Sequence, residues 1–389
     1  MSCPCPGFDR AKLTDVETIL EISALEALQL QRKGALLVDV RETDEHALGL
    51  AEGAIAAPRA ALEADPAKFL PAGQPVLLIC GSGRRSLLAA HALVVGGYQS
   101  VHSVAGGMTG WQAAGLPMAA LEDADFIERY SRHLRLPQVG MDGQRQLEQS
   151  RVLLVGAGGL GSPAAFYLAA AGVGMLRIVD DDQVDRSNLQ RQILHTESRI
   201  GMDKVASARQ SLAALNPRTR IETHALRLDA DNVESLIADV DVIVDGSDNF
   251  PTRYLLSDAC VQLGKPLVYG AVHRFEGQAS VFDAGRRRGI APCYRCLFPE
   301  PPRLEDAPNC AEAGVLGVLP GIIGLLQATE AIKLLLDLGQ SLSGRLLHFD
   351  ALAMRFRETR LRADPDCAVC APGRIFPGYR PMAEICGSG

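Results

Sequence analysis

The chain has 389 residues, and at about 150 residues per domain this length predicts two or three domains, each able to bury its own core. Hydrophobic residues make up 47% of it and charged residues 22%, a balance that excludes the collagen-like, coiled-coil and disordered classes. The net charge is -7, from 39 basic and 46 acidic residues. This charge excludes a chain built to neutralise nucleic acid or to lie on an anionic membrane.

Cysteine usage indicates the compartment. The N-terminal stretch has no basic segment, apolar core and cleavage site in series, so we expect a cytoplasmic protein. Thiols stay reduced in the cytosol, where cysteines serve metal binding or catalysis rather than disulfides. The spacing of the ten cysteines must therefore show which of these roles each one has.

The pattern of residues 20–117 predicts a small, mostly parallel α/β domain. Ser23-Ala-Leu-Glu26 has the pattern of a capping box and begins a helix that stops at Gly34. The elements expected after it are strands at 36–40, 76–80 and 101–104 and a helix at 86–95. Residues 118–125 are interpreted as the linker to the next domain.

One cysteine of this domain lies in a loop suited to an anion. Cys80 ends an apolar strand and is followed by small residues and the start of a helix. In that geometry the loop amides and the helix N-terminus point at the sulfur, lower its pKa and stabilise a thiolate or persulfide. A free core cysteine would need neither the glycines nor the adjacent arginines.

This first domain resembles the rhodanese family of sulfurtransferases. The matching motifs are Val38-Asp-Val-Arg-Glu42, a loop of the form C-x-x-G-x-R-S from Cys80 to Ser86, and Val104-Ala-Gly-Gly-Met-x-Gly-Trp111. The resemblance implies that Cys80 carries a transferable sulfur and that Arg85 belongs to the catalytic loop. Four residues separate them, whereas related phosphatase loops have five, and the shorter loop suits a persulfide better than a phosphate.

Two details of the resemblance stay open. The family usually has Gly-His-Ile where this chain has Gly49-Leu-Ala51, a departure that weakens no catalytic residue. Asp39 and Glu45 either bind arginines near the loop or form buried structural pairs.

A second α/β pattern occupies residues 126–371, with residues 372–389 as a C-terminal tail. Its expected strands are 151–155, 175–179, 241–244 and 267–269, alternating with helices, and together they predict a doubly wound, Rossmann-like sheet. The apolar stretch Leu316–Leu336 has the length of a membrane span. Gln327, Glu330 and Lys333 interrupt it, so we expect a buried helix and no membrane association.

A glycine-rich turn opens this second domain. Gly156-Ala-Gly158-Gly159-Leu-Gly161 follows a strand and begins a helix, the arrangement in which backbone amides cradle a phosphate. Asp180 ends the next strand and suits ribose hydroxyls. Up to this point an NAD-dependent oxidoreductase fits equally well.

The residues that follow favour cleavage of a phosphoanhydride. Arg191 and Lys204 supply two cations, and Asp248 supplies a carboxylate for an assumed Mg²⁺ ion. Hydride transfer needs an acid or base instead, whereas phosphoanhydride cleavage needs cations and a metal to stabilise spread charge. Each of these residues alone could equally be a cap or a surface ion pair.

The same region is similar to the ThiF/MoeB family of ubiquitin-activating-enzyme-like adenylyltransferases over residues 126–371. The shared motifs are Arg129-Tyr-Ser-Arg132, Val155–Gly161, Ser187-Asn-Leu-Gln-Arg-Gln192, Gly201-Met-Asp-Lys204, Asp248-Asn249 and Glu276-Gly-Gln278. The resemblance implies that ATP is bound by Gly156, Gly158, Gly159, Asp180, Ser187, Asn188, Arg191, Lys204, Asp248 and Asn249. It also implies that Arg132 reaches the triphosphate of a neighbouring protomer, and hence a homodimer.

Four cysteines have the spacing of a metal site. Cys293-x-x-Cys296 and Cys367-x-x-Cys370 lie on turns rich in proline and predict a structural, tetrahedral Zn²⁺ site without an open position. Two redox pairs are the alternative, although redox C-x-x-C motifs usually open a helix. A fifth cysteine, Cys310, takes by resemblance the place of a residue that links covalently to the substrate's carbonyl carbon, a step on which some relatives do not depend.

The two resemblances together imply one enzyme, a fusion of a rhodanese domain with an adenylyltransferase domain. The expected reaction is ATP-dependent adenylylation of a ubiquitin-fold sulfur carrier protein ending in Gly-Gly. Sulfur transfer from a Cys80 persulfide, charged by thiosulfate or another persulfide, then gives a thiocarboxylate. The alternatives are an NAD-dependent oxidoreductase, or an adenylyltransferase with a regulatory rhodanese module.

Overall fold

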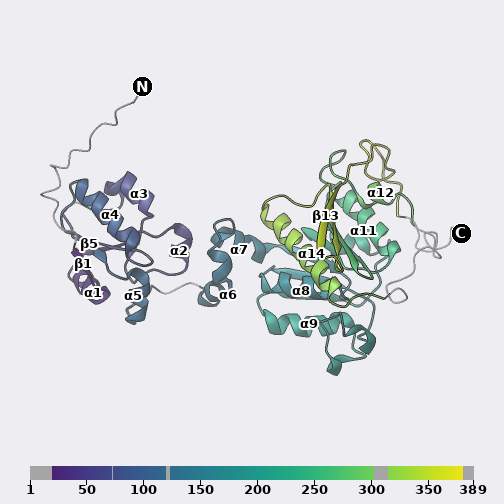
Figure 1. The fold of residues 1–389 in the computed structure, drawn as a ribbon, viewed down its shortest axis with the longest axis horizontal. Coiled ribbons are helices and arrows are strands. Elements are labelled where there is room, and N and C mark those ends of the chain that lie inside the picture. Colours follow the sequence, from purple (N-terminus) through teal and green to yellow (C-terminus); the bar gives the residue numbers. More distant parts are fainter. Residues whose placement is uncertain (1–19, 72, 120–122, 302–313, 380–389) are drawn as a thin grey trace. The chain divides into compact units, whose positions relative to one another are not determined.

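The computed structural model describes residues 20–71, 73–119, 123–301 and 314–379. They form two compact units, which divide between Met141 and Asp142. Figure 1 shows their helices and strands in chain order.

The first unit is built on a five-stranded sheet with the order β1-β5-β4-β2-β3, in which every pair is parallel. Its strands are β1 (Leu20–Ile22), β2 (Leu36–Asp39), β3 (Ile55–Ala56), β4 (Val76–Ile79) and β5 (Val101–Val104). Its helices are α1 (Ala24–Arg32), α2 (Thr43–Ala47), α3 (Arg59–Ala64), η2 (Pro66–Lys68), α4 (Arg84–Val95) and α5 (Gly107–Ala113). The expected small parallel domain is confirmed, and Ser23 and Glu26 form the expected capping box.

Strand β4 shows how this unit places its active loop. Successive side chains of a strand point to opposite faces, so Leu77 and Ile79 pack with Trp111 on one side of the sheet. Leu78 and Cys80 pack on the other side, against the helices α3 and α4. Cys80 therefore belongs to a packed core layer and also stands at the end of its strand.

Helix α6 (Ala124–Leu134) also belongs to the first unit. Phe126, Tyr130 and Leu134 form one apolar face of this helix, and Leu48 packs against it beside α2. Helix α7 (Gly140–Gln149) follows across the division between the units. The linker expected at residues 118–125 from the end of the first α/β pattern stays a prediction.

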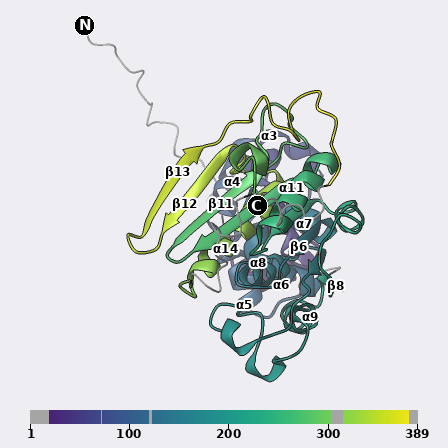
Figure 2. The ribbon, with the colours of Figure 1, turned by 90° about the vertical axis from the view of Figure 1, so that its right-hand side faces the viewer.

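The second unit contains an eight-stranded sheet with the order β13-β12-β11-β10-β9-β6-β7-β8. The strands β6 (Arg151–Val155), β7 (Met175–Val179), β8 (Arg220–His224), β9 (Val242–Asp245) and β10 (Leu267–His273) run parallel. The strands β11 (Glu276–Phe282), β12 (Arg345–Asp350) and β13 (Arg355–Arg360) continue the sheet antiparallel. Figure 2 shows these three at one end of the sheet and β8 at the other.

Helices cover both faces of the parallel half, as the sequence predicted for a doubly wound fold. They are α8 (Gly161–Ala170), α9 (Lys204–Leu215), α10 (Val233–Ile237), α11 (Phe250–Leu263) and α14 (Leu319–Leu336), with short turns at η3 (Arg186–Asn188), η4 (Glu197–Arg199) and α12 (Tyr294–Leu297). Chain order reverses around β6, which pairs with β7 on one side and β9 on the other. Ligands of such sheets bind beyond the carboxyl ends of the strands at this reversal.

Helix α14 is the long apolar segment noted in the sequence. Among the described residues it alone is long and apolar enough to cross a membrane, and 56% of it is buried. It packs on α8 and β10, and Gln327 donates hydrogen bonds to the carbonyls of Asp245 and Val268. These contacts are typical of a core helix, as the sequence predicted.

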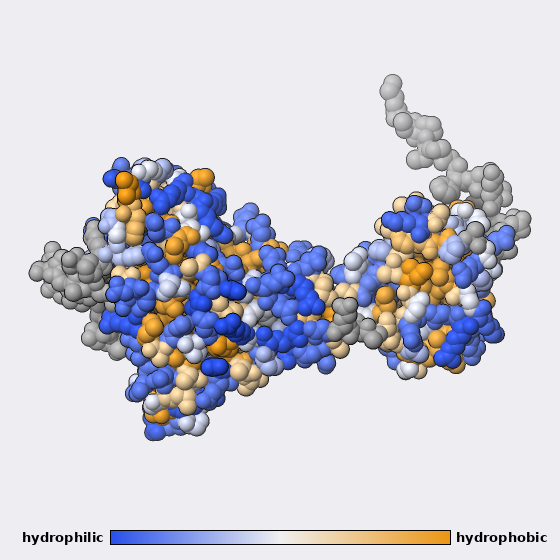
Figure 3. All heavy atoms as spheres, turned by 180° about the vertical axis from the view of Figure 1, so that it is seen from behind, coloured by the Kyte–Doolittle hydropathy of each residue, from blue (hydrophilic) through white to orange (hydrophobic). Residues whose placement is uncertain are grey.

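On the face in Figure 3 polar side chains surround small groups of apolar ones.

Candidate active sites

The first candidate site is the loop between β4 and α4. Gly83 has φ +96°, a left-handed conformation that turns the chain into the helix. The Gly83 amide donates to Cys80 Sγ at 3.2 Å, and Ser86 Oγ lies 3.4 Å from the same sulfur. Cys80 is only 1% exposed, so the loop closes around its own side chain.

These contacts favour the anionic form of the thiol. Burial is the largest single influence on Cys80 and by itself raises its pKa. The Ser86 hydroxyl and the amides of Ser86, Ser82 and Gly83 together outweigh it, so the pKa of Cys80 is lowered below its ordinary value. A lowered thiol pKa increases the share of the thiolate, which is the nucleophilic form of cysteine.

Helix α5 braces the loop from the other side. The Met108 amide donates to Cys80 O at 2.7 Å, and the Thr109 amide donates to Gly81 O at 3.1 Å. A Cβ atom on Gly107 would lie 2.0 Å from Cys80 O, so only glycine permits this approach. The motif from Val104 to Trp111 therefore holds the shape of the Cys80 loop.

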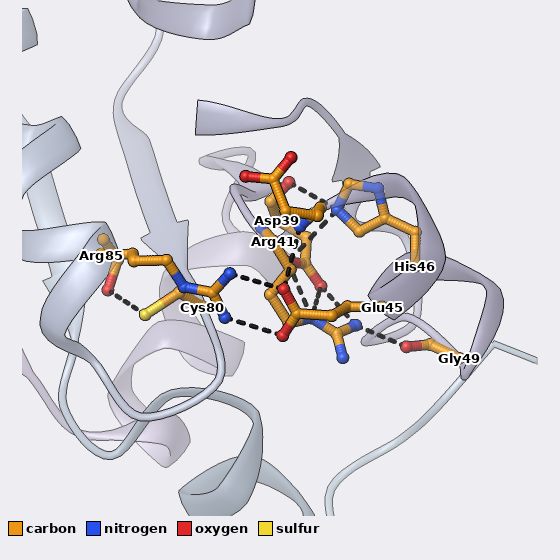
Figure 4. A network of polar contacts seen from close by, with 9 residues as sticks. Asp39, Arg41, Glu45, His46, Gly49, Cys80 and Arg85 are labelled. Atoms are coloured by element: carbon orange, nitrogen blue, oxygen red, sulfur yellow. Dashed lines mark hydrogen bonds and ion pairs between the residues drawn. The ribbon is translucent and has the colours of Figure 1, made fainter. Parts of the chain in front are cut away.

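Figure 4 shows the polar network beside Cys80 and settles the roles of Asp39 and Glu45. Glu45 binds Arg85 through both nitrogen atoms Nη1 and Nη2, at 2.5 and 2.7 Å. Asp39 is fully buried and pairs with Arg41, whose Nη2 also donates to Gly49 O at 2.6 Å. One acid thus holds the arginine of the loop, and the other forms a structural pair.

The second candidate site begins at the glycine-rich turn between β6 and α8. Gly156 has φ +91°, and a Cβ there would lie 2.6 Å from Gly246 O. A Cβ on Gly161 would lie 1.9 Å from Gly156 O. The turn is therefore compact because its glycines have no side chains, and this compactness leaves room above it for a ligand.

A cavity of about 300 Å³ opens beyond this turn, at the reversal of strand order. It is polar and contains most of the predicted ATP-binding residues. Those that line it are Gly156, Gly158, Gly159, Asp180, Arg191, Lys204, Asp248 and Asn249. The structure thus brings together residues that are more than 90 positions apart in the sequence.

Asp180 and Lys204 are both held in defined positions. Asp180 accepts hydrogen bonds from the Ala157 amide at 2.7 Å and the Asp182 amide at 2.9 Å. Burial raises the pKa of Asp180, opposed by the charge of Lys204 and by the Ala157 amide. Lys204 Nζ lies 2.6 Å from Asp182 Oδ2, and its side chain is only 6% exposed.

The predicted residues Ser187 and Asn188 do not line the cavity. Ser187 is exposed and donates to Asp185 Oδ1 at 2.6 Å. Asn188 Oδ1 accepts from Arg191 Nη2 at 2.6 Å, so this asparagine orients an arginine that does line the cavity. Arg132 lies exposed on α6 in the first unit and is likewise not among the lining residues.

Asp248 and Asn249 lie between β9 and α11. Asn249 is the N-cap of α11, and its Oδ1 accepts from the Thr252 amide at 3.0 Å. Asp248 is exposed and lines the cavity, and its carboxylate forms no hydrogen bond with the part of the chain that the structure describes. A carboxylate beside a phosphate site is the donor that Mg²⁺ prefers.

The sequence reasoning missed two positioning side chains. Arg253 lines the cavity, lies 3.6 Å from buried Asp245 and donates to Ser247 O at 3.0 Å. His195 is buried and holds the glycine-rich turn, because its Nε2 donates to Ala157 O at 2.9 Å. The sequence offered a signal for Arg253, because it lies four residues, about one helical turn, after Asn249. Nothing in the sequence distinguished His195.

The four cysteines predicted to bind zinc form one cluster. The Sγ–Sγ distances are 3.8 Å for Cys293–Cys296, 3.6 Å for Cys293–Cys367 and 3.4 Å for Cys296–Cys370. Zn–S bonds of about 2.3 Å in a tetrahedron place sulfurs about 3.8 Å apart, so the group fits this metal. The Asp364 amide donates to Cys296 Sγ at 3.3 Å. The cluster can hold a metal with four thiolates, as predicted.

The remaining cysteines are accounted for as far as the structure describes them. Cys310 lies outside the described residues, as do Cys3, Cys5 and Cys386. Cys260 is 2% exposed in the core, where burial raises its pKa, so it is an inert packing residue.

Both candidate sites lie in regions of the chain that match known protein families. Residues 23–114 match the rhodanese-like domain and residues 130–369 match the ThiF family. The E. coli protein MccB with ATP has the fold of the larger unit, with TM-score 0.54 at 21% identity over 62% of this chain and 74% of that one.

Three curated relatives are similar over nearly two thirds of the chain. The SAMP-activating enzyme E1 of Haloferax volcanii is 53% identical over 65% of this chain and 92% of its own length. The sulfur carrier protein adenylyltransferase of Thermus thermophilus is 50% identical over 63% and 90%. The probable adenylyltransferase/sulfurtransferase MoeZ of Mycobacterium tuberculosis is 51% identical over 64% and 63%.

These names favour adenylyl transfer over NAD-dependent oxidation as the chemistry of the cavity. The ThiF match alone spans more than half of the chain. The protein therefore belongs to the ThiF family, and it carries a rhodanese-like domain ahead of its ThiF region.

Proposed function

We propose that this protein is an ATP-dependent adenylyltransferase and sulfurtransferase that converts the C-terminal carboxylate of a ubiquitin-fold sulfur carrier protein, ending in Gly-Gly, into a thiocarboxylate. The observation that carries the proposal is the presence in one chain of a phosphate-binding cavity with two buried or oriented cations and a separate cysteine loop that favours a sulfur anion. The relatives named for sulfur carrier activation support the choice of substrate.

The first step activates the carboxylate, which is by itself a poor electrophile. One carboxylate oxygen attacks the α-phosphorus of ATP, the bond to the bridging oxygen breaks, and pyrophosphate leaves with the electron pair. Lys204 and Arg191 lie where they stabilise the charge that spreads over the phosphates. Asp248 would hold Mg²⁺, which supplies further positive charge to the pyrophosphate.

The second step transfers sulfur. The terminal sulfur of a Cys80 persulfide attacks the acyl carbon and AMP leaves, which gives an acyl disulfide. A second thiol then attacks Cys80 Sγ, so that the thiocarboxylate departs and a disulfide with Cys80 remains for reduction. Cys310 is a candidate for a covalent acyl intermediate before this step.

Three further features belong to the proposal. A structural Zn²⁺ ion held by the four clustered cysteines would tie α12 to the segment after β13. A homodimer would let Arg132, which is exposed on α6, reach the triphosphate of the partner. We expect the protein to act in the cytoplasm, with thiosulfate or a persulfide as the sulfur donor.

Intact-mass analysis of candidate carriers tests the proposal. Incubation with the enzyme, ATP, Mg²⁺ and thiosulfate should add about 16 mass units, the exchange of one oxygen for sulfur. Cys80→Ala should still exchange pyrophosphate into ATP in the presence of the carrier but should lose that gain. Binding of NAD in place of ATP, or no gain on any carrier that ends in Gly-Gly, contradicts the proposal.

A further inference from the structure

Arg85 lies at the entrance of the Cys80 loop in a fixed position. A Cβ on Gly81, the residue after Cys80, would lie 3.4 Å from Arg85 Nη2, so the guanidinium covers this glycine. Both Nη atoms donate to the Glu45 carboxylate, at 2.5 and 2.7 Å. Figure 4 shows the Arg85 side chain reaching past Cys80 to Glu45.

The pairing leaves part of the guanidinium available. An arginine has five N–H donors, and Glu45 takes one from each Nη. The other three have no hydrogen-bond partner among the described residues, and the side chain is 37% exposed. Arg85 can therefore bind an anionic group that approaches the Cys80 loop while Glu45 keeps the plane of the guanidinium fixed.

Glu45 is itself held from behind. It accepts from the Glu42 amide at 3.1 Å at the beginning of α2. The strand end before α2 is fixed by the buried Asp39–Arg41 pair, and His46 of α2 binds Asp39 O at 3.0 Å. Glu45 therefore presents its carboxylate from a rigid support, which is the arrangement expected of a residue that orients another.

Stability does not explain this contact. A second pair in the same unit, Arg59–Glu63, has side chains 35% and 28% exposed, against 37% and 29% for Arg85–Glu45. Ion pairs with this exposure contribute little to folding because water screens them. What distinguishes Arg85–Glu45 is its place beside Gly81 and Cys80.

We propose that Glu45 is a positioning residue for sulfur transfer, which orients Arg85 so that its remaining N–H donors bind the anionic part of an incoming sulfur donor. The inference rests on the proposed sulfurtransferase function of Cys80. With thiosulfate, Cys80 Sγ attacks the outer sulfur, the S–S bond of thiosulfate breaks, and sulfite leaves with the electron pair. Arg85 would hold the sulfonate oxygens that become sulfite, so its orientation decides how well the outer sulfur lines up with Cys80.

The test compares Glu45→Gln with the matched control Glu63→Gln in the full chain, with thiosulfate as donor and cyanide as acceptor. We expect Glu45→Gln to lower kcat by about tenfold, because orientation is lost, while the KM for thiosulfate stays the same or falls, because Arg85 keeps its charge. Glu63→Gln should change neither constant. Glu45→Asp, which keeps the charge but shortens the reach, should recover only part of kcat.

Alkylation of Cys80 supplies a second readout, followed on its own peptide by mass spectrometry. Glu45→Gln removes a negative charge beside Arg85, so it should raise the rate with anionic iodoacetate relative to neutral iodoacetamide by about threefold. An intact loop should keep its iodoacetamide rate. If that rate falls as much as kcat does, or if Glu45→Gln behaves like Glu63→Gln, the positioning role is wrong. If the wild-type chain forms no persulfide at all from thiosulfate, the proposed function fails instead.

Discussion

The two glycine-containing loops of this protein are built alike and used differently. Each follows a parallel strand, turns through a left-handed glycine, Gly83 or Gly156, and enters a helix. The first loop closes on the sulfur of Cys80, a residue of the chain itself that is only 1% exposed. The second leaves a cavity of about 300 Å³. The same backbone arrangement thus favours the anionic form of a resident thiol in one unit, and in the other it leaves the space where we propose that the phosphates of ATP bind.

The strongest test of this comparison adds a side chain at a close backbone approach, in one loop at a time. Gly107→Ala places a Cβ 2.0 Å from Cys80 O, and Gly161→Ala places one 1.9 Å from Gly156 O. We expect Gly107→Ala to reduce sulfur transfer from thiosulfate on the order of 100-fold and to spare ATP–pyrophosphate exchange. Gly161→Ala should do the reverse. Both activities are measured on each variant.

Suitable controls separate the clash from the backbone strain. Gly115 has φ +63°, close to the +54° of Gly107, yet nothing lies within 4 Å of its Cβ position. Gly115→Ala should therefore show the cost of the left-handed conformation alone. Gly321→Ala, also without a neighbour within 4 Å, serves the larger unit. Loss of both activities in Gly107→Ala would contradict the view that each unit carries its own anion site.

Local sequence predicted these loops because their determinants are local. Each loop contains the end of a strand, a glycine with positive φ and the beginning of a helix within about seven residues. Cys80, Gly156 and Asp180 could therefore be placed without knowledge of distant contacts. The alternation of Leu77, Leu78 and the residues around them likewise follows from strand geometry alone.

The side chains that support the loops could not be predicted in the same way. His195 lies 38 residues from Ala157, whose carbonyl it binds, and it follows no spacing rule. Glu45 lies 40 residues from Arg85, so the sequence left binding to a loop arginine and a buried pair equally open. Ser187 and Asn188 were assigned by motif, and only the fold shows that Asn188 contacts Arg191 rather than the cavity. Such contacts depend on how separate elements pack.

A smaller effect tests what is special to the sulfur loop. Ser86 places a hydroxyl 3.4 Å from Cys80 Sγ in addition to the loop amides. Ser86→Ala removes this hydrogen bond, so the pKa of Cys80 should rise and its alkylation by iodoacetamide at pH 7.5 should slow by about three- to tenfold. The pH dependence of that rate measures the shift.

Ser103→Ala is the control for Ser86→Ala, because Ser103 Oγ donates to Ser86 Oγ at 3.0 Å and does not bond the sulfur. Its effect on the alkylation rate should be smaller. Equal rates for Ser86→Ala and the wild-type chain would mean that the amides alone stabilise the thiolate, and the two loops would then be alike in this respect as well.

The smallest expected effect concerns the support of the phosphate loop. His195 Nε2 donates to Ala157 O, so in the neutral ring Nδ1 accepts from the Ser207 hydroxyl at 3.0 Å. Burial lowers the pKa of His195, and the charges of Lys204 and Arg199 lower it further, against the opposite effect of the Ala157 contact. The buried ring therefore stays neutral at a pH where the unfolded chain has already bound a proton.

This difference fixes the sign of a pH dependence. Below about pH 6.5 the unfolded chain binds more protons at this site than the folded one, so stability is lost as the pH falls from there toward the lowered folded pKa. The slope contributed by one such group is at most about 1.4 kcal/mol per pH unit. His195→Gln keeps a donor for Ala157 but cannot titrate, so the Tm of the ATP-sensitive transition should fall less between pH 7.5 and 5.5. His91→Gln, on the exposed side of α4, should leave that Tm difference unchanged. An unaltered difference in His195→Gln would show that the ring does not titrate in this range and that other groups set the acid sensitivity of the phosphate loop.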